Sequence, residues 1–196
     1  SMVVNSKQEL LIFGNTGSDD FPTTISAYDT SFNGRTDIYV AHLSANGRNM
    51  LNCSYIGGTG KDGLNGLQIR VGGLSSNTST LGFNYGDMYR GEIIVDANDN
   101  VFISSVSQSS DFPVQSGSFQ RNRSSKHDAV VIKLKPDLSD ILASTYLGGN
   151  DDDAAYGIGL DDSNHVFICG GTRSDSLPFP KTAYDQTFNK GLADGF

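Results

Sequence analysis

Tryptophan is absent from this 196-residue sequence, and glutamate nearly so. Of the 22 acidic residues only Glu9 and Glu92 are glutamates, which leaves 20 aspartates. Aspartate hydrogen-bonds to the nearby backbone and favours turns, whereas glutamate is compatible with helices. Together with 23 glycines, this imbalance argues against a mainly helical protein. The lack of tryptophan weakens a lectin function without excluding it, because tyrosine can also stack on sugars.

Positive charge and long apolar runs are also scarce. With 14 Lys and Arg against 22 Asp and Glu, the net charge is -8, and the cations are scattered. Nucleic acid is therefore not an expected partner, because phosphate binding needs clustered positive charge. No apolar run reaches the roughly 20 residues of a membrane span, so no membrane insertion is expected. The 37% hydrophobic share is enough for a packed core.

Few residues have the types and spacing that catalysis or metal binding requires. The three histidines lie at unrelated positions, His42, His127 and His165, and no nucleophile motif is present. We therefore predict no catalytic residues, no cofactor and no metal site. Cys53 and Cys169 are expected to be buried free thiols, with a disulfide left open.

Short motifs recur along the chain. The segments Asp20-Phe21-Pro22 and Tyr55-Ile56-Gly57-Gly58 return 91 residues later as Asp111-Phe112-Pro113 and Tyr146-Leu147-Gly148-Gly149. A second return is shorter, since Val101-Phe102-Ile103 reappears as Val166-Phe167-Ile168 after 65 residues, and Phe179-Pro180 follows Phe112-Pro113 by 67. The unit is therefore about 66 residues long, and 91 − 66 leaves a 25-residue insertion between Asp62 and Glu92.

Within a unit, the apolar segments are short, rich in β-branched residues and separated by turn residues. Residues 96–100 and 161–165 are predicted hairpin turns, because Asn and Asp tolerate positive φ. Four short antiparallel strands recurring at a fixed period are typical of a β-propeller blade. We predict an all-β fold of four-stranded propeller-type blades, forming an incomplete propeller of about two and a half units.

The boundaries follow from the motifs. We expect a tag or leader at 1–9, a first partial blade at 10–62, an insertion and linker at 63–91, a second blade at 92–149 and a truncated third blade at 150–196. About ten strands cannot close a propeller of roughly four to eight four-stranded blades. The chain is expected to be a fragment of a longer propeller, with assembly of several copies or an open stack as alternatives.

The motifs also carry a family resemblance. Nearly the whole chain except the insertion resembles the SBBP family of β-propeller repeats, most clearly in the segments Ser144-Thr145-Tyr146-Leu147-Gly148-Gly149-Asn150-Asp151-Asp152-Asp153, Tyr156-Gly157-Ile158, Asn164-His165-Val166-Phe167-Ile168, Gly171-Thr172, Phe179-Pro180 and Asp194-Gly195-Phe196. The resemblance implies a bacterial extracellular or cell-surface protein, large and multidomain, whose repeats have no established chemistry. The first unit departs from the pattern, with Cys53 where Ser144 stands.

We therefore expect a non-catalytic binding or scaffolding module, with a protein or glycan ligand held by loops. The insertion from Gly63 to Asp87 is the candidate contact, because it interrupts the repeat. One alternative is a propeller hydrolase or lyase whose catalytic residues lie outside this chain. The other is a calcium-stabilised adhesion module.

Two acidic segments bear on the calcium alternative. Residues 57–64 match a Gly-rich calcium nonapeptide once, and Asp151, Asp152 and Asp153 are consecutive carboxylates. Because a single nonapeptide lacks the tandem copies that share ions, we favour a Gly-rich turn between blades. The repeated Phe-Pro element is likewise expected to be structural, with Phe filling the gap between blades.

Overall fold

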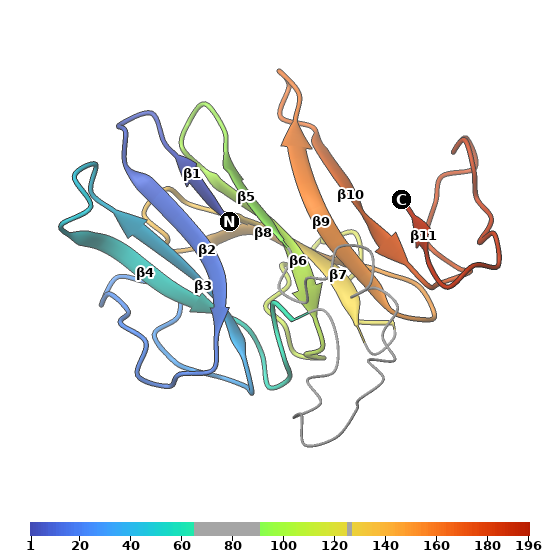
Figure 1. The fold of residues 1–196 in the computed structure, drawn as a ribbon, viewed down its shortest axis with the longest axis horizontal. Coiled ribbons are helices and arrows are strands. Elements are labelled where there is room, and N and C mark those ends of the chain that lie inside the picture. The colour runs from blue at the N-terminus through green and yellow to red at the C-terminus, as the bar shows by residue number, and fades with distance from the viewer. Residues whose placement is uncertain (65–90, 125–126) are drawn as a thin grey trace.

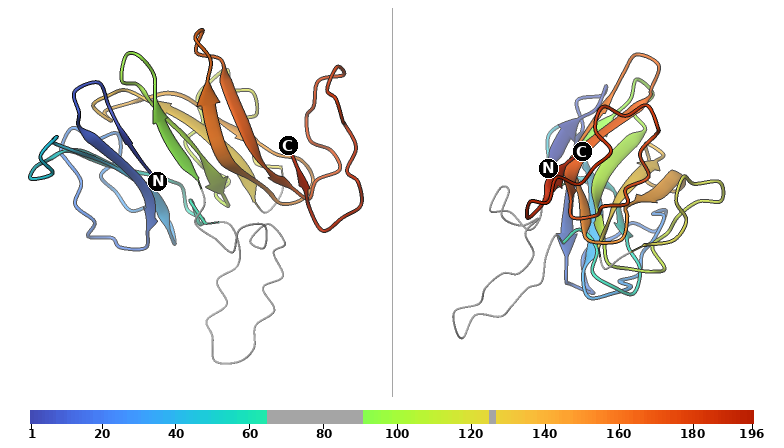
Figure 2. Two further views of the ribbon diagram at one scale, coloured as in Figure 1. Left: turned by 45° about the horizontal axis from the view of Figure 1, so that its top comes forward. Right: turned by 90° about the vertical axis from the view of Figure 1, so that its right-hand side faces the viewer.

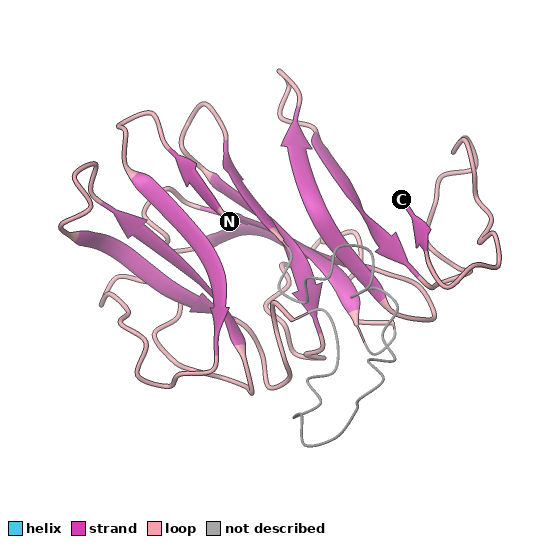
Figure 3. Cartoon of the chain, viewed as in Figure 1, coloured by secondary structure: helices cyan, strands magenta, loops and turns pink. Residues whose placement is uncertain are grey.

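The computed structural model describes residues 1–64, 91–124 and 127–196. Within these ranges the chain consists of strands and connecting loops, with no helix (Figure 3). It follows that the described residues contain no helix able to cross a membrane. The predicted all-β fold is confirmed.

Eleven described strands form three antiparallel sheets. Sheet 1 contains β1 (Met2–Val4), β2 (Leu10–Thr16), β3 (Asp37–Leu43) and β4 (Met50–Ile56), hydrogen-bonded in chain order. Sheet 2 contains β5 (Glu92–Val95), β6 (Val101–Ser107), β7 (Asp128–Leu134) and β8 (Ile141–Leu147). Sheet 3 contains β9 (Asp153–Leu160), β10 (Val166–Thr172) and β11 (Asp194–Gly195).

The recurring sequence segments occupy matching places in the sheets. Strands β2, β3 and β4 begin at residues 10, 37 and 50, and β6, β7 and β8 begin at 101, 128 and 141, each 91 residues later. Strand β10 begins 65 residues after β6. A residue of sheet 1 and the residue 91 positions later therefore have the same place in their respective sheets.

One expectation at the amino terminus is corrected. Residues 1–9 were assigned to a tag or leader, and the first blade was expected to be partial. Instead, Met2–Val4 pair with β2, and Val3 packs against the core. Sheet 1 is therefore four-stranded, because the alternation of residues 2–4 matches the pleat of a neighbouring strand.

The first hairpin of each sheet has the same turn. The fourth turn residue adopts positive φ in all three: Gln8 at 62°, Asp99 at 60° and Asn164 at 61°. The predicted turns at 96–100 and 161–165 are confirmed by backbone bonds from the amides of Asp99 and Asn164 back to the carbonyls of Asp96 and Asp161.

The sheets stand in a row that follows the chain (Figure 1). Sheet 2 lies between sheets 1 and 3, and the other views show the three in the same order (Figure 2). The first strand of each sheet contacts the first strand of the next, β1 with β5 and β5 with β9. The faces of adjacent sheets are therefore packed against each other around a line of first strands.

The main core lies between sheets 1 and 2. It is a cluster of large buried side chains, which are Leu11, Phe13, Ile38, Val40, Ile56, Ile93, Val101, Ile103, Phe112, Val130, Ile132, Leu134, Leu138, Ile141 and Tyr146. Between sheets 2 and 3 a smaller cluster joins Val106, Ala154 and Tyr156, with Ala193 packed against it. The first pair of sheets thus buries far more apolar surface than the second.

The Phe-Pro elements have a structural place: Phe112 lies in the core between sheets 1 and 2, as expected for a residue that fills a gap between sheets, whereas Phe21 lies outside that core. Phe21 and Phe112 each pack on a tyrosine of their own sheet, Tyr55 and Tyr146, with ring centroids 6.2 and 6.1 Å apart. Each tyrosine hydroxyl accepts a hydrogen bond from the backbone amide of its phenylalanine. Phe179 is 38% exposed, because no described strand of sheet 3 carries the matching tyrosine.

The cysteines are free and lie in different sheets, so the open disulfide alternative does not hold in this structure. Cys53 is buried, as expected, whereas Cys169 is exposed on sheet 3, which corrects the prediction for that residue. Burial raises the pKa of the Cys53 thiol to about 11, so this thiol stays protonated at neutral pH. Most of the predicted insertion between Gly63 and Asp87 lies outside the described residues.

Candidate functional site in the junctions between sheets

A buried carboxylate joins sheet 1 to sheet 2. Asp62 lies beyond the Gly-Gly pair that follows β4, and it is fully buried. Its Oδ1 accepts a hydrogen bond from the Ser107 hydroxyl at 2.5 Å. Its Oδ2 accepts bonds from the Ser109 hydroxyl at 2.7 Å and from the Gly58 amide at 2.8 Å. We call this arrangement of one carboxylate and two hydroxyls a carboxylate latch.

A second carboxylate latch lies where the chain passes from sheet 2 into sheet 3. Asp153, which lies 91 residues after Asp62, is the first residue of β9, pairs with Thr172 of the same sheet and is also fully buried. It accepts bonds from the Thr172 hydroxyl at 2.5 Å, the Ser174 hydroxyl at 2.8 Å and the Gly149 amide at 2.7 Å. The two junctions therefore contain the same carboxylate, hydroxyl and amide groups in the same connectivity.

Local sequence prepares both halves of each latch. The two hydroxyl residues of each latch also bond to each other. The Ser109 amide donates to the Ser107 hydroxyl at 3.0 Å, and the Ser174 amide donates to the Thr172 hydroxyl at 2.9 Å. In the turn after β4, position 58 must be glycine, because a Cβ added there would lie 2.4 Å from Oδ1 of Asp111. The Gly-Gly motif therefore permits the close approach of two sheets.

Burial also changes the proton affinity of the latch. Loss of hydration raises the pKa of Asp62 and of Asp153 to about 6, and the hydroxyl and amide bonds only partly oppose this rise. The ionised carboxylate is favoured in water and disfavoured between the sheets. Each latch therefore becomes protonated under mildly acidic conditions while the protein is folded.

Next to each latch, three matching positions carry different side chains. At the first junction these are Thr36, Lys61 and Gln108; at the second they are His127, Asp152 and Arg173. The backbone bonds are the same: the Asp62 amide bonds to the Thr36 carbonyl at 2.8 Å, and the Asp153 amide to the His127 carbonyl at 2.8 Å. The backbone thus preserves the junction while the side chains change its polarity.

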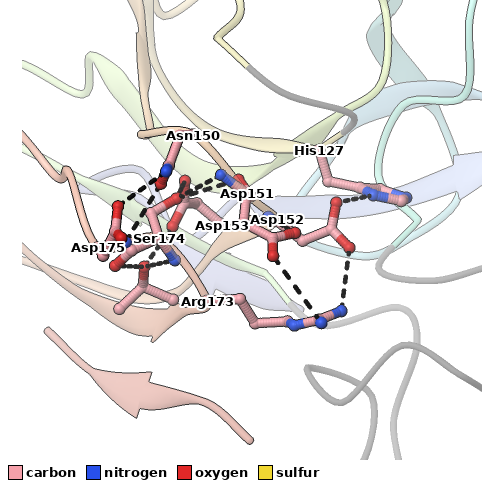
Figure 4. A network of polar contacts seen from close by, with 9 residues as sticks. His127, Asn150, Asp151, Asp152, Asp153, Arg173, Ser174 and Asp175 are labelled. Carbon is pink, nitrogen blue, oxygen red and sulfur yellow. Dashed lines mark hydrogen bonds and ion pairs between the residues drawn. The ribbon is translucent and has the colours of Figure 1, made fainter. Parts of the chain in front are cut away.

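The second junction holds a group of charges, shown in Figure 4. His127 Nδ1 lies 2.8 Å from Asp152 Oδ1. Arg173 reaches toward Asp151 and Asp152 at 3.8 Å each. Close by, the Asn150 side chain donates a hydrogen bond of 2.7 Å to Asp175. This polar cluster connects the turn after β8 to sheet 3 beyond the latch itself.

The consecutive carboxylates considered for calcium point to different partners. Asp151 accepts a bond from the Asp152 amide at 2.8 Å, Asp152 faces His127, and Asp153 is the latch residue. Among the described residues, no group of three or more His, Cys, Asp and Glu side chains has a metal-binding arrangement. In residues 57–64, Asp62 points to sheet 2 and its oxygens accept hydroxyl and amide protons.

An apolar groove of about 560 Å³ opens between sheets 2 and 3. Its walls include Phe102 and Val131 of sheet 2 and Val166 and Ile168 of sheet 3. At the first junction the matching space is filled by side chains of the third and fourth strands of sheet 2, such as Ile132. Sheet 3 has only the short β11 after β10 among its described strands. The groove is the part of a junction that those strands would fill.

The three histidines stay apart and contact separate acids. His42 lies 2.9 Å from Glu9 in sheet 1, and His165 lies 2.7 Å from Asp161 within a turn. From the sequence, Asp62 and Asp153 were considered only as calcium ligands, and their hydroxyl partners were not predicted. The signal that could have found them is their spacing, since Asp62 and Asp153 differ by 91 and the Ser/Thr-x-Ser triplets at 107–109 and 172–174 differ by 65.

Comparison of this chain with models of known protein families found no match, and comparison with curated proteins found no relative.

Proposed function

We propose that this chain is a non-catalytic binding or scaffolding module built from β-propeller-type blades, and that it belongs to a larger bacterial extracellular or cell-surface protein. The observation that carries the proposal is the carboxylate latch, which occurs twice with the same partners. Each buried acid fixes the point at which the chain passes from one sheet into the next, and so supports a repeated arrangement of neighbouring blades. Rigid blades of this kind present variable loops to a ligand.

Two further features support blades of a propeller. Each sheet is antiparallel and ordered along the chain, as in a blade. The first strands of neighbouring sheets contact each other, β1 with β5 and β5 with β9, as strands do around a propeller axis. The bacterial surface location comes from the resemblance to the SBBP repeats.

The same latch weighs against the calcium alternative. Asp62 and Asp153 are fully buried, and their oxygens accept bonds from hydroxyl and amide donors. Calcium would have to displace those donors to reach the carboxylate oxygens, which it binds directly. A melting curve with and without a chelator tests the calcium alternative, for which an unchanged midpoint would be fatal.

Ligand binding through loops is tested with arrayed probes. The purified chain is applied to an array of bacterial and host polysaccharides and to immobilised extracellular-matrix proteins, and a variant lacking residues 67–87 is the matched control. We expect saturable binding to a protein or glycan probe, with loss of binding in the variant and an unchanged melting midpoint.

Two outcomes contradict this function. If no probe binds while the chain is folded, the chain does not act as a binding module for these ligand classes. If mass spectrometry detects shortened glycans released from the array, the chain itself is catalytic and the proposed non-catalytic function is wrong.

A further inference from the structure

Sheet 1 carries a pair of hydroxyls that matches the pairs of the two carboxylate latches, and no described carboxylate bonds to this pair. Thr16 and Ser18 lie 91 residues before Ser107 and Ser109. The Ser18 amide bonds to the Thr16 hydroxyl at 3.0 Å, as the Ser109 amide bonds to Ser107. The hydroxyl pair of sheet 1 therefore has the turn geometry of the two occupied pairs.

The matching tyrosine holds this turn as well. The Tyr55 hydroxyl donates to the Ser18 carbonyl at 2.8 Å, just as the Tyr146 hydroxyl donates to the Ser109 carbonyl at 2.6 Å. The two turns differ in their exposure to solvent, because Ser109 is buried at 1% exposure whereas Ser18 is exposed. We call the hydroxyl pair of Thr16 and Ser18 the socket of sheet 1. It has the geometry of the two occupied pairs and is open to solvent.

The outward face of sheet 1 is apolar and exposed along β1, whereas Ala41 and Cys53 on the same face are buried. Met2 and Val4 are 68% and 51% exposed, and they share the outward face of sheet 1 with Leu10 and Ile12, their partners in β2. The residues 91 positions after Met2 and Ile12 are Ile93 and Ile103, which sheet 1 covers to 2% and 0% exposure. The outward face of sheet 1 therefore matches the face of sheet 2 that another sheet covers.

We propose that the outward face of sheet 1 docks a further four-stranded unit of the same kind, and that a Gly-Gly-x-x-x-Asp segment of this unit lies beside the end of β2, as Asp153 lies beside Thr172, so that its carboxylate accepts bonds from the Thr16 and Ser18 hydroxyls. This inference rests on the proposed function and names the neighbour of the module. The occupant is fixed by the chemistry of the two internal junctions: an apolar sheet face supplies the burial, and one aspartate supplies the acceptor. Tyr39 is a local departure, since it replaces the position of Val130 and stacks on Phe21 at 4.4 Å.

The register of the chain allows a direct test. Ser1 corresponds to Gly157, because the Asp161 turn follows the Asn5 turn by 156 residues. A copy of residues 92–156 fused ahead of Ser1 therefore continues into β1 in register, and its copy of Asp153 falls opposite Thr16 and Ser18. In the control fusion the copied Asp153 is replaced by Ala.

Hydrogen exchange provides the readout. In the fusion, we expect amides of β1 and of residues 16–18 to exchange at least roughly tenfold more slowly than in the unfused chain, with a higher melting midpoint. The control fusion should lose most of this protection. Unchanged exchange overturns the proposal, and so does a fused unit that stays unfolded, because the face is proposed to supply the burial that the unit needs.

Two measurements on the unfused chain complete the test. Replacing Thr16 by Val and Ser18 by Ala should leave its melting midpoint nearly unchanged, whereas Ser107→Ala with Ser109→Ala should lower it. Sedimentation should show a monomer. A dimer abolished by Met2→Lys would mean that a second copy covers the face, which contradicts the proposed occupant. Neither result depends on ligand binding by the loops, so this inference and the proposed function fail separately.

Discussion

The two junctions between sheets share a latch and differ in almost everything around it. The junction of sheets 1 and 2 encloses a large aliphatic and aromatic core, whereas that of sheets 2 and 3 contains small residues, a charge cluster and an open groove. Both nevertheless bury one aspartate on two hydroxyls. Each latch therefore ties the turn that leaves one sheet to the first paired residue of the next, and the apolar contacts determine how strongly the sheets adhere.

The difference traces to the third and fourth strands. At the first junction, β7 and β8 contribute Ile132, Leu134 and Ile141 to the core. At the second, β11 is the only described strand of sheet 3 in those places, and Val166 is 40% exposed while its counterpart Val101 is fully buried. The same strand type is thus buried or open depending on its neighbours.

The largest effect is expected from a loss of apolar packing at the first junction. Ile103→Ala removes a fully buried side chain from the first junction, and we expect a loss of about 2–4 kcal/mol in the free energy of unfolding. The matched change Ile168→Ala at the half-buried position of sheet 3 should cost less than about 1 kcal/mol. Urea unfolding measures both. Equal losses would show that the two junctions are packed alike.

The pH dependence tests the latches, which the junctions share. Since burial raises the pKa of Asp62 and Asp153 to about 6, the folded state binds more protons than the unfolded chain between pH 4 and 6. Their stabilising contribution is complete below pH 4 and is lost as the pH rises through 6, by up to about 2–3 kcal/mol for each group.

The double variant Asp62→Asn with Asp153→Asn isolates this effect. Between pH 5 and 7, we expect the unfolding free energy of the unmodified chain to fall, and that of this variant to stay nearly constant. Asp185→Asn is the control, because hydrogen bonds, chiefly from Thr187, lower the pKa of this exposed carboxyl to about 2, and the substitution leaves the decline in place. A chain whose stability rises from pH 5 to 7 would contradict the buried-latch account.

A smaller effect is expected at the tyrosines that hold the hydroxyl turns. Tyr146→Phe removes two hydrogen bonds from a fully buried hydroxyl, one to the Ser109 carbonyl and one from the Phe112 amide, and should cost about 1–2 kcal/mol. Tyr55→Phe removes the matching bonds beside the exposed Ser18 and should cost about 1 kcal/mol or less. Thermal unfolding of the two variants compares them, and the reverse order would contradict an open socket on sheet 1.

The smallest effect concerns the charges of the second junction. Arg173→Gln introduces the residue that the first junction has at position 108, and removes ion pairs of 3.8 Å that are partly exposed. We expect a loss below about 1 kcal/mol at low salt, and almost none at 1 M NaCl, where surface pairs are screened. A larger loss that persists in high salt would show that Arg173 stabilises the junction by packing.

Much of the fold could be predicted from the sequence. The alternation in segments such as Val101–Ser107 predicts strands, and the Asn and Asp runs predict turns, because both depend on neighbouring residues. The short strand Met2–Val4 was missed, since three residues show too little alternation to identify a strand. The hydroxyl partners of Asp62 were also missed, because they lie 45 and 47 residues along the chain.

By itself, the sequence determined the strands, the turns and the 91- and 65-residue spacings that place similar residues in each sheet. Tertiary structure alone decided which of those similar residues are buried. Thr16 and Ser18 have the same turn as Ser107 and Ser109, yet among the described residues only the second pair bonds to a carboxylate. The reason is physical: hydration is lost only where another sheet covers the face, and local sequence does not contain that neighbour.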